Sequence, residues 1–147
     1  MILSSSPTHI INDMLQGEIA AAETYQQTLG QAGNAPGADD LRRLHREHSE
    51  AASRLQQYVR TLGGESSQGS QTWGAFARAV EGAAMLFGNA AALKALKAGE
   101  ERGVATYEEA LTNKHLPEEF LEFVRTSLLP QTRSHVEVLD RLLQSAA

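Results

Sequence analysis

The sequence predicts an all-α fold, a single domain built from four long helices. In four long segments the apolar residues recur at alternating spacings of three and four, which is the seam of a left-handed helix bundle. No window of four or more residues alternates apolar and polar positions with β-branched enrichment, so no strand is expected. The length of 147 residues is close to the usual size of one domain.

Clusters of Gly, Pro, Ser and Asn divide the chain into two helical hairpins and a crossover. Residues 7–62 form the first hairpin, 63–88 the crossover and 89–145 the second hairpin. The apolar spacing of WGAFARAVEGAAMLF predicts a short helix within the crossover. A connection of this length can carry the chain along the bundle and produce up-down-down-up order.

Capping residues mark the expected beginning of each long helix. Small polar side chains satisfy the free N–H groups of a first turn, and proline is tolerated at the first helical position. The expected starts are, in chain order, Ser6 with Pro7, Asp39 or Asp40, Asn89, and Pro117.

In each of the four apolar seams, one position is occupied by a Glu or a His instead of an apolar residue. The second seam, for example, consists of Leu41, Leu44, His48, Ala51, Leu55, Tyr58 and Leu62. The interrupting residues of the four seams are Glu18, His48, Glu100 and His135. Burying a lone carboxylate or imidazole costs several kcal/mol unless a partner compensates it, so the four residues require a shared explanation.

The two hairpins resemble one another in sequence. GEIAAAETYQQTL at Gly17 and GEERGVATYEEAL at Gly99 share Gly-Glu, then Thr-Tyr, then Leu. HSEAASRLQ at His48 and HVEVLDRLL at His135 share His, a Glu two positions on, and Arg-Leu. This pattern indicates one helical hairpin used twice, related by an approximate two-fold axis.

Helix geometry predicts how closely these side chains approach. Counted from the turn that joins the first two helices, the positions of Glu18 and His48 along the hairpin differ by roughly 3 Å. The positions of Glu100 and His135 along the second hairpin differ by roughly 7.5 Å. The length of the glutamate side chain and a bend at Pro130 would partly close this gap.

Two interpretations of this polar layer remain open from the residues. Two carboxylates and two neutral imidazoles carry a charge that matches one divalent ion, and the donor set suits Fe, Zn or Mn. His45, one turn before His48, is the best additional ligand. Alternatively the layer holds no metal, and each Glu pairs with the His of its own hairpin to fix register. Tyr25 and Tyr107 on the same seams are expected mainly to pack, each hydroxyl finding one partner.

Composition excludes several other functions. The net charge of −5 and the lack of a basic block exclude a nucleic-acid partner held by phosphate neutralisation. No apolar stretch approaches the roughly 20 residues that span a bilayer, and no secretory signal is recognised, so a cytoplasmic location is expected. The chain has no cysteine, which excludes disulfides and thiolate ligands.

The arrangement of Glu on the first and third helices and His on the second and fourth resembles the ferritin-like bundles. In more detail, ALKALKAGEERG and LLPQTRSHVEVLDRL resemble an uncharacterised bacterial ferritin-like family, catalogued as a domain of unknown function. The resemblance implies that Glu18, His48, Glu100 and His135 occupy metal-ligand positions. Di-iron members carry Glu-x-x-His on the second and fourth helices, whereas here His45 and Thr132 stand three residues before each His.

The sequence therefore predicts a ferritin-like bundle whose core binds one divalent metal, without assigning a reaction. The alternative is a non-catalytic structural or stress-related bundle without metal that acts through a protein partner or by self-association, for example as a homodimer.

Overall fold

The computed structural model describes residues 6–32, 37–66 and 89–146. All elements in these ranges are helical: α1 (Pro7–Ala32), α2 (Ala38–Thr61), α4 (Asn89–Ala110), α5 (Glu118–Phe123), the π-helical η3 (Val124–Leu128) and α6 (Leu129–Ala146). The all-α prediction is confirmed for this part of the chain. The short helix expected in the crossover lies outside the described residues.

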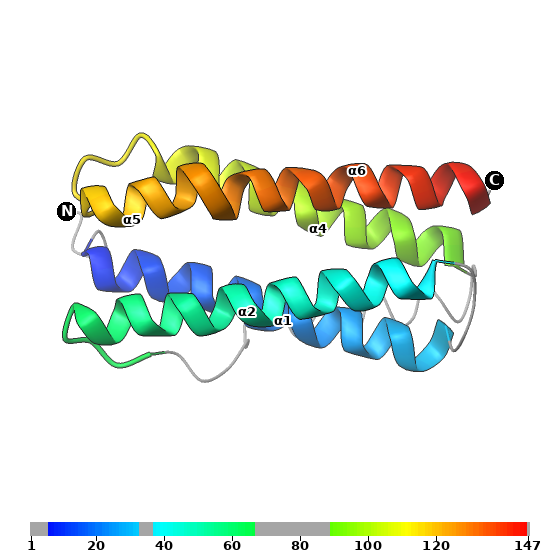
Figure 1. Ribbon diagram of the computed structural model, residues 1–147, viewed down its shortest axis with the longest axis horizontal. Helices are drawn as coiled ribbons and strands as arrows, with labels where there is room; N and C mark the ends of the chain where they lie inside the picture. The colour runs from blue at the N-terminus through cyan, green and yellow to red at the C-terminus, as the bar shows by residue number, and fades with distance from the viewer. Residues whose placement is uncertain (1–5, 33–36, 67–88, 147) are drawn as a thin grey trace.

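The described helices lie side by side along the long axis of the molecule (Figure 1). α1 and α2 form one antiparallel hairpin, and α4 forms the second with the continuous rod of α5, η3 and α6. The colour gradient of Figure 1 shows that α2 and α4 run in the same direction. No helix in the described ranges is both long enough and apolar enough to cross a membrane.

The helix beginnings follow the expected residues with one correction. Ser6 caps α1 by accepting a hydrogen bond from the backbone N–H of His9, and Pro117 is the N-cap of α5. In α2 the expected Asp39 or Asp40 cap is wrong, because Gly37 with φ 89° is the N-cap and makes no side-chain bond. Both aspartates lie in the first turn, where their charges favour the positive end of the helix dipole.

α2 ends at a Schellman-type turn that removes its last seam residues from the core. The N–H of Gly64 bonds to the carbonyl of Val59, and Gly63 adopts φ 82°. Val59 is fully buried, while the predicted seam residue Leu62 is 40% exposed. The predicted register therefore holds through Leu55 and fails in the final turn.

The last rod widens into a π-helical turn directly before Pro130. The N–H of Leu129 bonds to the carbonyl of Val124, five residues earlier. Proline has no N–H, and its ring clashes with the carbonyl four residues before it, so widening the helix here relieves the clash. The bend expected at Pro130 thus takes the form of a π-turn.

Two apolar clusters fill the interior on either side of the polar seam residues. One gathers around Leu15, Leu55 and Phe120, and the other around Leu44, Leu96 and Leu139. At roughly 25 cal/mol for each Å² of buried apolar surface, these clusters supply the main stabilisation of the fold. They flank the polar layer on both sides.

Candidate functional site

A buried polar layer crosses the middle of the four rods. Each rod contributes one residue: Glu18 from α1, His48 from α2, Glu100 from α4 and His135 from α6. All four side chains are buried. The seam spacing thus brings together the four residues expected from the sequence.

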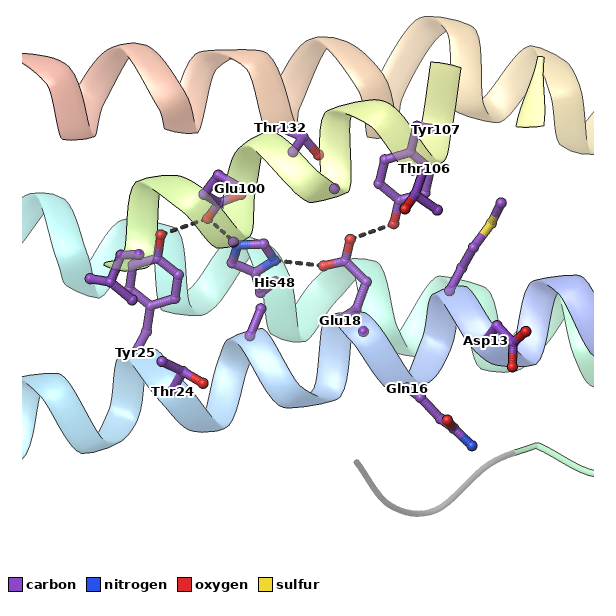
Figure 2. Close-up of a pocket in the computed structure, with 16 residues that line it drawn as sticks. Asp13, Gln16, Glu18, Thr24, Tyr25, His48, Glu100, Thr106, Tyr107 and Thr132 are labelled. Atoms are coloured by element: carbon purple, nitrogen blue, oxygen red, sulfur yellow. Dashed lines mark hydrogen bonds and ion pairs between the residues drawn. The ribbon is translucent and has the colours of Figure 1, made fainter. Parts of the chain in front are cut away.

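His48 lies at the centre of the layer, between two carboxylates (Figure 2). Its Nδ1 is 2.6 Å from Glu18 Oε1, and its Nε2 is 2.7 Å from Glu100 Oε2. The first contact lies within a hairpin and the second joins the two hairpins. His48 therefore connects both halves of the layer through opposite sides of one ring.

His135 also has a carboxylate on each side of its ring. Its Nδ1 is 3.3 Å from Glu100 Oε1, and its Nε2 is 2.7 Å from Glu47 Oε1. Glu47 lies on α2, and its side chain is 29% exposed. It connects the fully buried His135 with the surface of the protein.

Sequence reasoning did not identify Glu47. It precedes His48, so it falls on the flank of the α2 seam rather than in the seam. Residues beside a seam commonly reach across a helix interface. The position of Glu47 beside the α2 seam is therefore the feature of the sequence that could have indicated this contact.

The two tyrosines each hydrogen-bond to a glutamate of the other hairpin. Tyr25 on α1 donates to Glu100 Oε2 at 2.6 Å, and Tyr107 on α4 donates to Glu18 Oε2. Figure 2 shows the resulting chain from Tyr25 through Glu100, His48 and Glu18 to Tyr107. The expectation that each hydroxyl finds one partner is confirmed.

Charge interactions in the layer outweigh burial for the central pair. Burial alone would lower the pKa of His48, but the negative charges of Glu100 and Glu18 raise it to about 10. Burial alone would raise the pKa of Glu100, but the positive charge of His48 and hydrogen bonds from both histidines lower it to about 2. In the absence of any bound ion, His48 is therefore an imidazolium between carboxylates near neutral pH.

Burial raises the pKa of both tyrosines well above the ordinary value. The neighbouring charge adds to the effect, from Glu100 for Tyr25 and from Glu18 for Tyr107. Both phenols remain neutral hydrogen-bond donors over the physiological pH range.

Three residues of the layer could together hold a metal ion. Ligand atoms of His48, Glu100 and His135 all lie within 4.8 Å of one another. Glu18 and His45 do not belong to this group, although both were expected as ligands. Glu18 instead bonds to the outer nitrogen of His48, and the half-buried His45 lies one turn before it on α2.

A pocket of about 450 Å³ opens onto this layer between α1 and α4. Glu18, His48 and Glu100 contribute to its lining, together with both tyrosines. Figure 2 shows these side chains converging from α1, α2 and α4. The buried layer is therefore in contact with a ligand-sized space.

In the ranges that the structure describes, every regular element is helical and the core contains a buried histidine–glutamate cluster. Residues 6–113 match the model of a family described as a domain of unknown function, DUF2383, and the chain belongs to that family. A comparison with curated proteins gave no match, and a comparison with solved structures gave none.

Proposed function

We propose that the protein binds one divalent metal ion through His48, Glu100 and His135. The observation that carries the proposal is the orientation of the two imidazole rings. One nitrogen of each ring faces the carboxylate of Glu100, at 2.7 Å for His48 and 3.3 Å for His135. Two imidazoles and one carboxylate are an established donor set for Zn and for non-haem Fe.

The outer nitrogen of each ring supports this assignment. Glu18 accepts from His48 Nδ1 and Glu47 from His135 Nε2, at 2.6 and 2.7 Å. Metal-bound histidines usually donate their second N–H to a carboxylate, which fixes the tautomer and orients the ring. We therefore assign Glu18 an orienting role, and Glu47 the same role on the other ring.

The spacing of the donor atoms suits a first-row metal. Two ligand atoms bound at about 2.1 Å in a tetrahedral arrangement are separated by roughly 3.4 Å. The separations of 2.7 Å from His48 to Glu100 Oε2 and 3.3 Å from His135 to Glu100 Oε1 would widen by about 0.7 and 0.1 Å to reach this value. Fe, Zn and Mn remain the candidate ions because the set contains only nitrogen and oxygen donors.

A single ion is favoured over a pair. Two bridged metals require additional carboxylates, which Glu-x-x-His motifs supply in di-iron bundles. Thr132 occupies one of those positions, and its hydroxyl donates to the carbonyl of Leu128 instead of facing a ligand. His45 occupies the other. We accordingly propose a ferritin-like, up-down-down-up bundle with a mononuclear site.

The alternative is a metal-free structural bundle, and one observation favours it. In the described ranges, every buried side-chain nitrogen and oxygen of the layer has a hydrogen-bond partner. A closed network of this kind can fix the register of four helices without a ligand. Its function would then lie in self-association or in a protein partner.

Elemental analysis of untagged protein distinguishes the two functions. We expect near-stoichiometric Fe, Zn or Mn after purification or reconstitution, and loss of the ion in His48→Ala and His135→Ala variants. The matched control is His45→Ala, which removes an imidazole one turn from His48 and should retain the ion. Parent protein that stays metal-free after reconstitution with each ion would overturn the metal proposal and leave the structural one.

A further inference from the structure

The pocket between α1 and α4 exists because small residues line both helices. Gly17 and Ala21 on α1 line the pocket, as do Gly99 and Gly103 on α4. None of the four carries a side chain larger than a methyl group, which leaves room between the two helices in the part of the chain that the structure describes. The volume of about 450 Å³ lies within the usual range for small-molecule sites.

The lining is nearly symmetric between the two helices. Six of the α1 residues in it have a counterpart 82 positions later on α4 that also lines the pocket. Glu18 with Glu100 is one such pair, and Met14 with Leu96 is another. Both hairpins thus present the same chemistry to this space, with apolar walls and a carboxylate.

Among the described residues that line the pocket, acidic side chains predominate and none is lysine or arginine. Asp13, Glu18 and Glu100 contribute three carboxylates, and His48 is the one basic side chain among the lining residues. Even with His48 fully charged, the lining keeps a net negative charge. An anion would meet repulsion there, whereas a cation would be attracted.

We propose that this pocket binds a small organic amine. An ammonium group offers three donors and no acceptor, which matches the acceptor-only carboxylates. Glu18 accepts hydrogen bonds from His48 and Tyr107, so it retains lone pairs for a third donor. The apolar body of the ligand would lie along Met14 and Leu96. The proposal concerns the metal-free protein, because the pocket shares Glu100 and His48 with the proposed metal site.

Calorimetry on metal-free protein tests the proposal with three probes of equal size. Benzylamine, benzyl alcohol and benzoate differ in charge and share one ring. At neutral pH we expect benzylamine to bind at least about tenfold more tightly than benzyl alcohol, and benzoate not to bind. Equal binding of all three, or no binding of benzylamine at millimolar concentration, would overturn the proposal.

A pair of variants locates the site. Ala21→Met fills the pocket and should abolish benzylamine binding, while Ala105→Met places the same side chain on the exposed face of α4 and should leave binding unchanged. If Ala21→Met does not fold, amide chemical-shift mapping on the parent protein replaces it. Shifts must then cluster on the facing parts of α1 and α4, and shifts elsewhere would contradict the assignment.

Discussion

Tyr107 on α4 donates a buried hydrogen bond to Glu18 on α1, in the opposite hairpin. Tyr25 makes the reciprocal bond to Glu100. Each tyrosine stands seven residues after the glutamate of its own helix but binds the glutamate of the other one. The two bonds therefore fasten the hairpins to each other at the level of the polar layer.

Removing either hydroxyl should destabilise the fold. Tyr25→Phe and Tyr107→Phe each leave a buried carboxylate with one donor fewer, which costs about 1–3 kcal/mol. Chemical denaturation measures the change. Tyr58→Phe is the control, because Tyr58 packs against Phe120 and Phe123 and its hydroxyl bonds to no other described residue. A loss in Tyr58→Phe equal to that in Tyr107→Phe would contradict this role for the crossed bonds.

The stability of the metal-free protein should fall as the pH rises above neutral. The pKa of His48 is about 10 when folded and 6.5 at its ordinary value, so between these values the unfolded chain releases a proton that the folded protein keeps. The stabilisation is complete below about pH 6.5 and lost by about pH 10. At acid pH the stabilisation comes from Glu100, whose pKa is 4.5 at its ordinary value and about 2 in the folded protein. Its contribution to the free energy of unfolding is lost as the pH falls from 4.5 to about 2.

Urea unfolding at a series of pH values checks this dependence. His48→Gln should flatten the decline between pH 6.5 and 10, although the variant is less stable at every pH. The exposed His115 provides the control, since His115→Gln should keep the parent profile. A parent stability that rises over the alkaline window would show that His48 is not the protonated centre of the layer.

Two glycines that look alike in sequence should respond oppositely to alanine. Gly30 lies within α1 with nothing near its added Cβ, so Gly30→Ala should stabilise the helix by up to about 1 kcal/mol. Gly63 is equally open but adopts φ 82°, so Gly63→Ala should destabilise by about 1–2 kcal/mol. Thermal denaturation of both variants compares them directly, and shifts of the same sign would contradict the backbone assignment at Gly63.

The sequence predicts much of this fold and part of its site, for physical reasons that differ between residues. The three-four spacing places His48 and Glu100 in seams that must face the core, and burial follows from that position. The spacing does not say which neighbour a polar atom chooses. The spacing therefore does not predict two features of the site. One is the contact of Glu47 with His135 from beside the α2 seam, and the other is the pair of crossed tyrosine hydrogen bonds.

The sequence does not predict the π-turn before Pro130, for a related reason. Helical levels counted at a constant rise separate Glu100 and His135 by more than one turn. The structure brings their side chains to 3.3 Å, with five residues of wider helix between the interhelical turn and His135. Proline signals that the helix is disturbed, but whether it kinks or widens depends on packing that no single sequence position reveals.

If the proposed metal site forms, the ion must displace a proton from His48. Both nitrogens of that ring carry protons in the metal-free protein near neutral pH, because its pKa is about 10. The apparent metal affinity should therefore rise about tenfold per pH unit from pH 7 to 9. Titration calorimetry in two buffers of different ionisation enthalpy should count about one proton released for each ion bound. Binding that is independent of pH would place the ion away from His48.

Glu47 should set the strength of that site without contacting the ion. Its carboxylate holds the outer nitrogen of His135 at 2.7 Å. Losing such an orienting carboxylate typically costs 10- to 100-fold in metal affinity, so Glu47→Gln should weaken binding by about that factor while the stoichiometry stays at one. Glu50→Gln removes an exposed charge from the same helix and should have little effect. Equal weakening in both variants would reduce the role of Glu47 to its charge alone, and complete loss of the ion in Glu47→Gln would make it a ligand.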